Sequence, residues 1–163
     1  MSTVRFIADL HLSHANMSKK RGFETIEEHD EYIIKQWNSV VRKRDTTYIL
    51  GDVTMEKSAP YHLLSRLKGI KNVVLGNHDH RQDVKKLLEY VNSVSGMLSY
   101  KKVILTHCPV HPMEMDYRFS HNIHGHIHEK QVLYNGLSDL RYICVSCERV
   151  DFIPKTLIEL GIV

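Results

Sequence analysis

Three histidines, His124, His126 and His128, stand at alternate positions of one short segment, with Gly125 between the first two. Side chains alternate between the two faces of an extended chain, so this spacing predicts three imidazoles on one face. Neutral imidazole is a common metal ligand and a common general acid or base. The segment alone leaves two interpretations open, a polar strand face in solvent and a site that does chemistry.

Side chains of the types that bind metal ions also follow each of the earlier predicted strands. In open α/β sheets, ligand sites form at the carboxyl ends of strands, where the loops meet. Carboxylate, imidazole and amide donors without a thiolate favour catalytic Mn²⁺, Fe or Zn²⁺ over a structural zinc finger, and they are too many for one ion. Before the histidine segment, these residues are Asp9 and His11, Asp52, Asn77 and His78, and His107.

Apolar strands and amphipathic helices alternate along the chain and must position these groups. Thr25 followed by Glu28 is typical of a capping box at a helix start. Short connections late in the chain indicate antiparallel pairing there. Because the sequence shows no repeat or linker, we expect residues 1–163 to form one α/β domain. The apolar periodicity predicts strands over residues 3–8, 46–50, 72–75, 102–106, 131–134 and 142–145, and helices over residues 25–41, 59–67 and 83–90.

The composition is that of an ordinary globular protein, with 42% hydrophobic and 25% charged residues and a net charge of +3. This charge is too mild to predict nucleic-acid binding by itself. The basic clusters Lys19–Arg21 and Arg42–Arg44 are interpreted as solvated loops. No signal-peptide layout or membrane-spanning apolar run is visible, which predicts a cytoplasmic protein without a membrane partner.

The three cysteines are expected to be reduced thiols, because their number is odd and no export signal accompanies them. Cys144 and Cys147 form a CxxC, which could indicate zinc or redox chemistry. They fall in a stretch interpreted as a strand from Arg141 to Val145 and beyond, where positions three apart face opposite sides, and no second CxxC is present. We therefore interpret them as small buried hydrophobic residues.

Five short motifs, in order from residue 9 to residue 128, resemble those of the calcineurin-like metallophosphoesterases. The resemblance implies an α/β fold, a four-layer α-β-β-α sandwich of two mixed β-sheets flanked by helices, with a metal site at the carboxyl ends of the strands. The chain looks like the smaller bacterial, archaeal or phage phosphoesterases. The motifs are Asp9-x-His11, Gly51-Asp52, Gly76-Asn77-His78-Asp79, His107 and Gly125-His126-x-His128.

The same resemblance implies a binuclear centre of two divalent ions per chain. Mn²⁺ is the favoured metal, with Fe, Zn²⁺ and Ni²⁺ as alternatives. Two ions about 3.5–4 Å apart can hold a bridging hydroxide for attack on phosphorus and neutralise the charge that develops on it. By position, the implied ligands are Asp9, His11 and His128 for the first ion, Asn77, His107 and His126 for the second, and Asp52 as the bridge.

His78 would face the phosphate, where it would stabilise the transition state or protonate the leaving oxygen. Asp79 has two interpretations, a residue that orients His78 and a carboxylate at a helix start. His124 lies outside the motif and is interpreted as a neighbour of the ligands. Candidate substrate contacts are His14, Asn16 and Arg118.

Three functions are compatible with the motifs. We expect a phosphodiesterase that cleaves small or nucleotide-like phosphate esters. A nuclease acting on DNA or RNA is an alternative, although it would need a wider basic surface than a net charge of +3 indicates. A non-catalytic scaffold, like the retromer subunit of similar fold, is disfavoured because His78 and every implied ligand are present. The chain length predicts an open pocket without a cap domain.

Overall fold

The first sheet consists of four parallel strands in the order β1-β2-β3-β4. The computed structural model describes residues 2–55 and 59–162 of the chain. Apolar side chains are buried along the central strands, as expected for a parallel sheet that is covered on both faces. The strands are β1 (Val4–Ile7), β2 (Thr46–Leu50), β3 (Ile70–Val74) and β4 (Ser93–Ser95).

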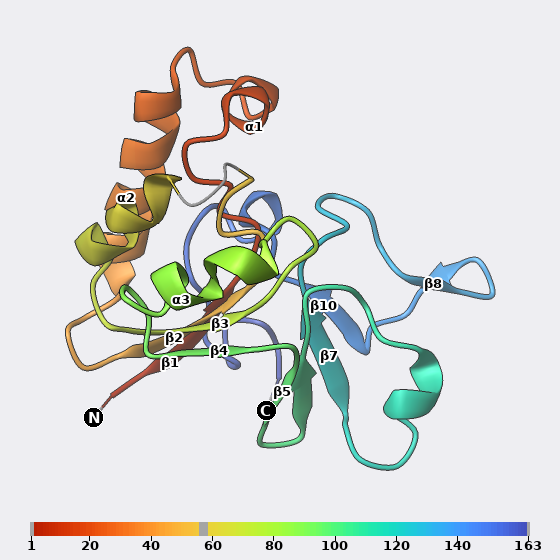
Figure 1. Cartoon of the computed structure of the whole chain (residues 1–163). Coiled ribbons are helices and arrows are strands. Elements are labelled where there is room, and N and C mark those ends of the chain that lie inside the picture. Colours follow the sequence, from red (N-terminus) through yellow and green to blue (C-terminus); the bar gives the residue numbers. More distant parts are fainter. Residues whose placement is uncertain (1, 56–58, 163) are drawn as a thin grey trace.

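The second sheet has the order β10-β7-β6-β5 and lies beside the first (Figure 1). Buried residues of both sheets, among them Ile49 and Leu105, belong to one hydrophobic core. Antiparallel pairing in this sheet is confined to β5 and β6, so only the second sheet is mixed. The predicted class of two sheets flanked by helices is confirmed. The strands are β5 (Leu98–Tyr100), β6 (Val103–Leu105), β7 (His121–His124) and β10 (Tyr142–Cys144).

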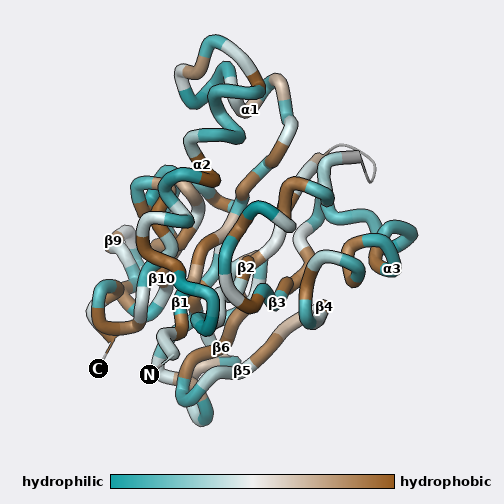
Figure 2. The backbone as a smooth tube through the Cα atoms, turned by 90° about the vertical axis from the view of Figure 1, so that its left-hand side faces the viewer, coloured by the Kyte–Doolittle hydropathy of each residue, from teal (hydrophilic) through white to brown (hydrophobic). Residues whose placement is uncertain are grey.

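The α-helices α1 (Ala15–Lys20), α2 (Ile26–Val40) and α3 (Val84–Leu87) lie on the side of the first sheet (Figure 1). α2 begins as predicted, because the Thr25 side chain accepts a hydrogen bond from the Glu28 amide at 3.0 Å. The Glu28 carboxylate in turn accepts a hydrogen bond from the Glu24 amide at 3.1 Å, one residue earlier than in a standard capping box. Hydrophilic stretches dominate α1, whereas hydrophobic stretches follow the inner strands (Figure 2).

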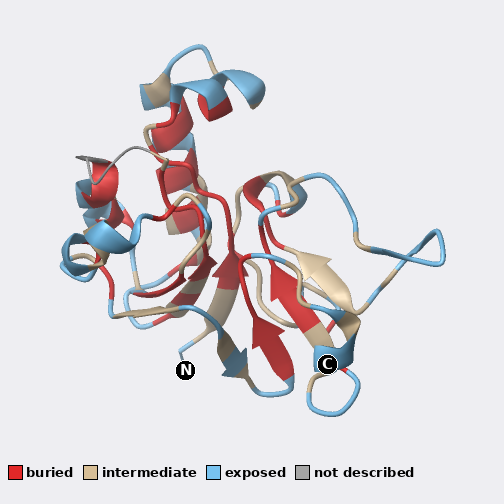
Figure 3. Cartoon of the chain, turned by 45° about the vertical axis from the view of Figure 1, so that its right-hand side comes forward, coloured by how far each residue is buried: buried red, intermediate tan, exposed pale blue. Residues whose placement is uncertain are grey.

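Several predicted elements differ from the observed ones in type or length. The helix predicted over 59–67 is the 3-10 helix η1 (Ala59–Arg66), and the helix predicted over 83–90 is α3 preceded by η2 (Arg81–Asp83). The strand predicted over 131–134 is only β8 (Leu133–Tyr134), which pairs with β9 (Leu137–Ser138) in an exposed hairpin (Figure 3). α1, β4 and β5 were not predicted, because each has too few residues to show a period.

After β10 the chain runs back along the end of β1 and joins the two sheets. The Ala8 amide donates to the Val145 carbonyl at 2.8 Å, and the Cys147 amide donates to the Ala8 carbonyl at 3.1 Å. The strand ends at Cys144, and Cys147 is buried at the start of the 3-10 helix η4 (Cys147–Arg149). The prediction that both cysteines lie on one strand is therefore wrong. This return places residues 146–148 beside the first motif.

The described residues also include the short 3-10 helix η3 (Pro112–Glu114). Over the part of the chain that the structure describes, we find no helix with both the length and the apolar content needed to cross a lipid bilayer. All three cysteines have free thiols.

Candidate metal centre

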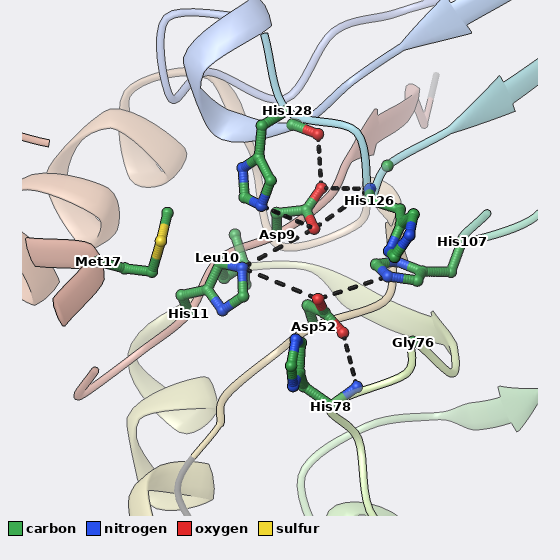
Figure 4. A network of polar contacts seen from close by, with 12 residues as sticks. Asp9, Leu10, His11, Met17, Asp52, Gly76, His78, His107, His126 and His128 are labelled. Carbon is green, nitrogen blue, oxygen red and sulfur yellow. Dashed lines mark hydrogen bonds and ion pairs between the residues drawn. The ribbon is translucent and has the colours of Figure 1, made fainter. Parts of the chain in front are cut away.

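The five motifs converge at the edge where strands of both sheets end (Figure 4). Each motif follows a strand directly or within a few residues, because parallel strands deliver their carboxyl ends to the same edge. The predicted strand-end residues that meet there are Asp9 and His11 after β1, Asp52 after β2, Asn77 and His78 after β3, His107 after β6, and His126 and His128 after β7.

Asp52 lies between the two halves of this cluster. Its Oδ2 is 3.8 Å from His11 Nε2 and 3.4 Å from His107 Nε2. Its Oδ1 accepts a hydrogen bond from the His78 amide at 3.0 Å. Burial alone would raise the pKa of Asp52, but the hydrogen bond and charge of His107 outweigh it, and the pKa is lowered. Asp52 is therefore an ionised carboxylate that can face two ions at once.

The first half of the cluster consists of Asp9, His11 and His128, whose potential ligand atoms lie within 4.8 Å of one another. Asp9 Oδ1 is 3.9 Å from His11 Nε2 and 4.0 Å from His128 Nε2. Both ring nitrogens of His11 are buried and have no hydrogen-bond partner among the described residues. Burial lowers the pKa of His11 to about 3, so the imidazole is neutral. A buried neutral imidazole without a partner fits a metal ligand.

The second half consists of Asn77, His107 and His126. Asn77 Oδ1 is 2.9 Å from His107 Nε2 and 2.8 Å from His126 Nδ1. His107 Nδ1 lies 2.8 Å from the Leu50 carbonyl, which fixes a proton on that nitrogen and leaves Nε2 for the centre. Burial would lower the pKa of His107, but Asp52 outweighs it and raises the pKa. Positive charge is therefore stabilised at His107 Nε2, and either a proton or a divalent ion can supply this charge.

Cys108 adds a donor that the sequence did not suggest. Its sulfur lies within 4.8 Å of ligand atoms of His107 and His126, and the residue is exposed. The predicted donor set contained no thiolate. The structure thus places a thiol at the rim of the second half, beside the three groups predicted there.

The backbone at these positions is strained in a way typical of functional sites. Asp and His enter the left-handed region more readily than most residues, at a cost of about 1–3 kcal/mol each. The surrounding bonds and packing must compensate this cost. Five of the seven predicted ligands have φ between 48° and 70°: Asp9, His11, Asp52, His126 and His128.

Three glycines allow close approach between the strand ends. A Cβ atom on Gly125 would lie 2.5 Å from the Asp9 carboxylate, and one on Gly76 would overlap the Asp52 carboxylate. Gly51 has a φ of +85°, and a Cβ there would overlap the His107 ring. Each glycine therefore makes room for a predicted ligand from another strand end.

Asp79 has neither of the roles considered from the sequence. Its carboxylate accepts hydrogen bonds from the backbone amides of Asp52 at 2.8 Å, Val53 at 3.0 Å and Gly76 at 2.8 Å. It is buried and makes no hydrogen bond to the His78 side chain among the described residues, and the next helix is capped by His80 instead. Asp79 instead ties the loop after β2 to the loop after β3. Both interpretations are wrong because the burial of this side chain was not visible in the sequence.

The prediction that three histidines share one face is also wrong. β7 ends at His124, and His126 and His128 have left-handed backbone angles, so strict alternation stops there. His124 is buried, its Nδ1 lies 2.8 Å from the Gly125 carbonyl, and its ring meets Tyr142 edge-on. Burial lowers the pKa of His124 to about 4, which keeps it neutral. His124 is absent from the three groups of potential metal-binding residues found among the described residues.

The three candidate substrate contacts occupy different places. His14 Nδ1 accepts a hydrogen bond from the Met17 amide and caps α1, with its ring centroid 5.9 Å from that of His11. Asn16 is exposed on α1. Arg118 is exposed and lines a cavity beside Met97 and Leu98 to which the metal cluster does not contribute. The structure thus brings His14 to the cluster and leaves Arg118 apart from it.

Three residues that support the cluster were missed. Arg21 was interpreted as part of a solvated basic loop, but its side chain is only 2% exposed. Ser146 Oγ donates to Asp9 Oδ2 at 2.6 Å. Burial would raise the pKa of Glu148, but His128 and Arg21 outweigh it and lower the pKa to about 2. No local pattern marks these residues, because their partners lie over a hundred positions away or on another loop.

Two cavities open beside the histidines of the last motif. One has a volume of about 270 Å³ and the other about 310 Å³, and both are lined by Lys20, His128 and Glu129. The first is also lined by Arg21, Glu148 and Phe152, and the second by His126 and Lys130. A small anionic ligand at the cluster would therefore meet lysines on this flank.

Two sheets with paired His, Asp and Asn groups at their common edge define the class of metal-dependent phosphoesterases. The family described as calcineurin-like phosphoesterase matches residues 2–102, and the chain belongs to this family. Its members are hydrolases that use divalent metal ions to cleave phosphate esters. The His and Asp groups of this chain are able to hold such ions.

The chain is similar to an uncharacterized protein of Methanocaldococcus jannaschii, with 32% identity over 96% of this chain and 88% of the relative. It is 30% identical to the Gene 66 protein of Mycobacterium phage L5, over 82% of this chain and 81% of the relative. A crystal structure of a protein of unknown function from Aquifex aeolicus has the same fold, with a TM-score of 0.72 and 23% identity over 99% and 98% of the two chains.

Proposed function

We propose that this protein is a two-metal phosphodiesterase that acts on small or nucleotide-like phosphate esters. The observation that carries the proposal is the position of Asp52, whose Oδ2 lies 3.8 Å from His11 and 3.4 Å from His107. One carboxylate thus faces both halves of the cluster, as a bridge between two ions requires. Mn²⁺ is the favoured metal, with Fe, Zn²⁺ and Ni²⁺ as alternatives.

The protein's residues would have distinct tasks in this reaction. Asp9, His11 and His128 would hold one ion, Asn77, His107 and His126 the other, and Asp52 both. When bound, the two ions supply Lewis-acid activation of water and neutralise phosphoryl charge. These seven side chains would fix where this activation occurs, and the buried ones would exclude bulk water from one side of it.

His78 is proposed as the catalytic residue. Its amide is anchored on Asp52 Oδ1 at 3.0 Å, and its ring centroid lies 6.2 Å from that of His11. This anchor leaves the imidazole at the mouth of the cluster, partly exposed to solvent. From there, it would donate a proton or a hydrogen bond to the leaving oxygen of the ester.

The cavities beside His126 and His128 support a small substrate. Their volumes of about 270 and 310 Å³ lie near the lower end of the range for small-molecule sites. Lys20 would contact anionic groups there, and the open flank would leave space for the second ester substituent of a diester. We also propose the cytoplasm as the compartment, because an odd number of cysteines favours reduced thiols.

A screen with added Mn²⁺ tests the proposal. Generic mono- and diesters, cyclic nucleotides, dinucleoside polyphosphates and short oligonucleotides are compared, with the His78→Ala protein as control. We expect hydrolysis of small diesters that is lost in the control. The proposal would fail if the purified protein held no divalent metal and cleaved no ester, and cleavage of oligonucleotides alone would replace it with the nuclease alternative.

A further inference from the structure

Arg21 is a buried cation that holds the backbone of the first motif. Its Nη2 donates to the Asp9 carbonyl at 2.7 Å, and its Nη1 donates to the Leu10 carbonyl at 3.0 Å. Both carbonyls belong to the turn that places the Asp9 and His11 side chains. Because the guanidinium is planar and rigid, two bonds from it fix the orientation of this turn as well as its position.

Glu148 connects the same guanidinium to the last motif. Its Oε1 accepts a hydrogen bond from Arg21 Nε at 2.8 Å, and its Oε2 lies 3.2 Å from His128 Nδ1. A proton on His128 Nδ1 is thereby held toward Glu148, which leaves the Nε2 lone pair for the centre. His128 Nε2 indeed faces Asp9 Oδ1 at 4.0 Å. This carboxylate–histidine arrangement is the one that commonly orients a metal-binding imidazole.

The outer side of Arg21 is closed by other side chains. Its Nη1 lies 2.9 Å from His29 Nε2, and the Phe152 ring centroid lies 5.3 Å from its central carbon. His29 in turn contacts the Asp30 carboxylate, which accepts from the Ser13 amide at 3.0 Å. Arg21 therefore has a partner on each side and is only 2% exposed, whereas Glu148, at 15%, borders the cavity of about 270 Å³ beside His128.

We propose that Arg21 and Glu148 are positioning residues. They hold the Asp9–His11 turn and the His128 imidazole in the relative positions that form the first half of the centre. The proposal rests on the proposed function, since it assigns this half to a metal ion. It adds the residue that caps the carboxyl end of α1 and a residue of η4, both outside all five motifs. The pair acts on His128 from the side opposite the centre, so neither residue is a ligand.

Mn²⁺ binding, measured by calorimetry without substrate, separates this role from general stabilisation. Glu148→Gln keeps the size of the side chain but replaces one acceptor oxygen with an NH₂ group. It is introduced into two backgrounds, His126→Ala to disable the second half and His11→Ala to disable the first. Arg21→Lys is measured in the same backgrounds, because a lysine retains the charge but lacks the fork that spans both carbonyls.

The matched control is Glu31→Gln, which breaks an exposed carboxylate–arginine pair with Arg66 on the surface of α2. Thermal unfolding of the metal-free proteins is recorded in parallel. The control is expected to bind Mn²⁺ as the unsubstituted protein does, because exposed pairs of this kind contribute little.

We expect Glu148→Gln to weaken the Mn²⁺ site of the His126→Ala protein by roughly 10–100-fold, the usual effect of removing such a partner. In the His11→Ala background, Mn²⁺ affinity should change by less than about twofold, as for independent sites. Unchanged affinity in the first background, or equal weakening in both, would overturn the inference. Failure of the unsubstituted protein to bind any Mn²⁺ would instead overturn the proposed function on which it rests.

Discussion

Asp9 and His11 are enclosed by protein, whereas Asn77 and His126, on the other side of Asp52, are exposed. The enclosed half is held from outside, by Ser146 on Asp9 and by Glu148 on His128. The open half is held from within its own motifs, because Asn77 Oδ1 contacts both His107 and His126. The two halves thus differ in which residues support them. Exposure also varies within each half, because His128 of the first half is 22% exposed and His107 of the second half is buried.

The largest expected effect comes from the residue that both halves share. Asp52→Asn should reduce turnover by about a thousandfold or more and lower the Mn²⁺ content below two ions per chain, since an amide cannot bridge two cations. Initial rates and metal analysis of the same preparation measure both effects. If both halves kept their metal after this substitution, the role of Asp52 as the link between them would be wrong.

His78→Ala should separate catalysis from metal binding. The imidazole is not in either half, and only its backbone amide contacts Asp52. Turnover should fall roughly 10²–10⁴-fold, the range for losing a general acid, while the metal content stays that of the unsubstituted protein. Rates and metal analysis again provide the readout. Loss of metal in proportion to activity would show that His78 supports the centre rather than the reaction.

Asp79→Asn should loosen the two loops that carry Asp52 and Asn77. An amide cannot replace the carboxylate that accepts three backbone N–H bonds, so the free energy of unfolding should fall by about 2–3 kcal/mol. Denaturant unfolding of the metal-free protein measures this change. The control is Asp116→Asn, since that carboxylate is half exposed and pairs with Arg141 on the surface. If the two variants were equally stable, the claim that the Asp79 carboxylate links the two loops would be wrong.

The sequence predicted the open half more completely than the enclosed one. Asn77, His78 and their glycines are neighbours in the chain, and strand ends bring His107 to them by a general rule of α/β sheets. Ser146 contacts Asp9 only after the chain has returned from the second sheet to β1, and the same return brings Glu148 to Arg21. Such long-range contacts leave no periodic or local pattern, which is why Arg21 was mistaken for a solvated charge.

The elements of the fold can be divided in the same way, into those that a local pattern predicted and those that depend on tertiary contacts. Parallel strands with buried apolar runs, such as β2 and β3, were predicted nearly to their ends, as was α2 with its Thr25 cap. The end of β7 was not, because the left-handed turn at His126 has no signature beyond Gly125 and the histidines themselves. Burial and tertiary hydrogen bonds determine the backbone conformation at this turn. Strict alternation of side chains therefore predicted the wrong face for His124.

The smallest expected effect concerns how fast the two ions leave. Protein loaded with Mn²⁺ and mixed with a chelator should release metal in two phases, about tenfold apart if the enclosure of the first half adds roughly 1.4 kcal/mol to the barrier. His126→Ala should remove the fast phase, because it disables the exposed half. His121→Ala, a histidine that contacts only Ser120 in the described structure, is the control and should keep both phases. A single phase in the unsubstituted protein would mean that burial does not distinguish the two halves, and that solvent reaches the Asp9–His11 side as readily as the His126 side.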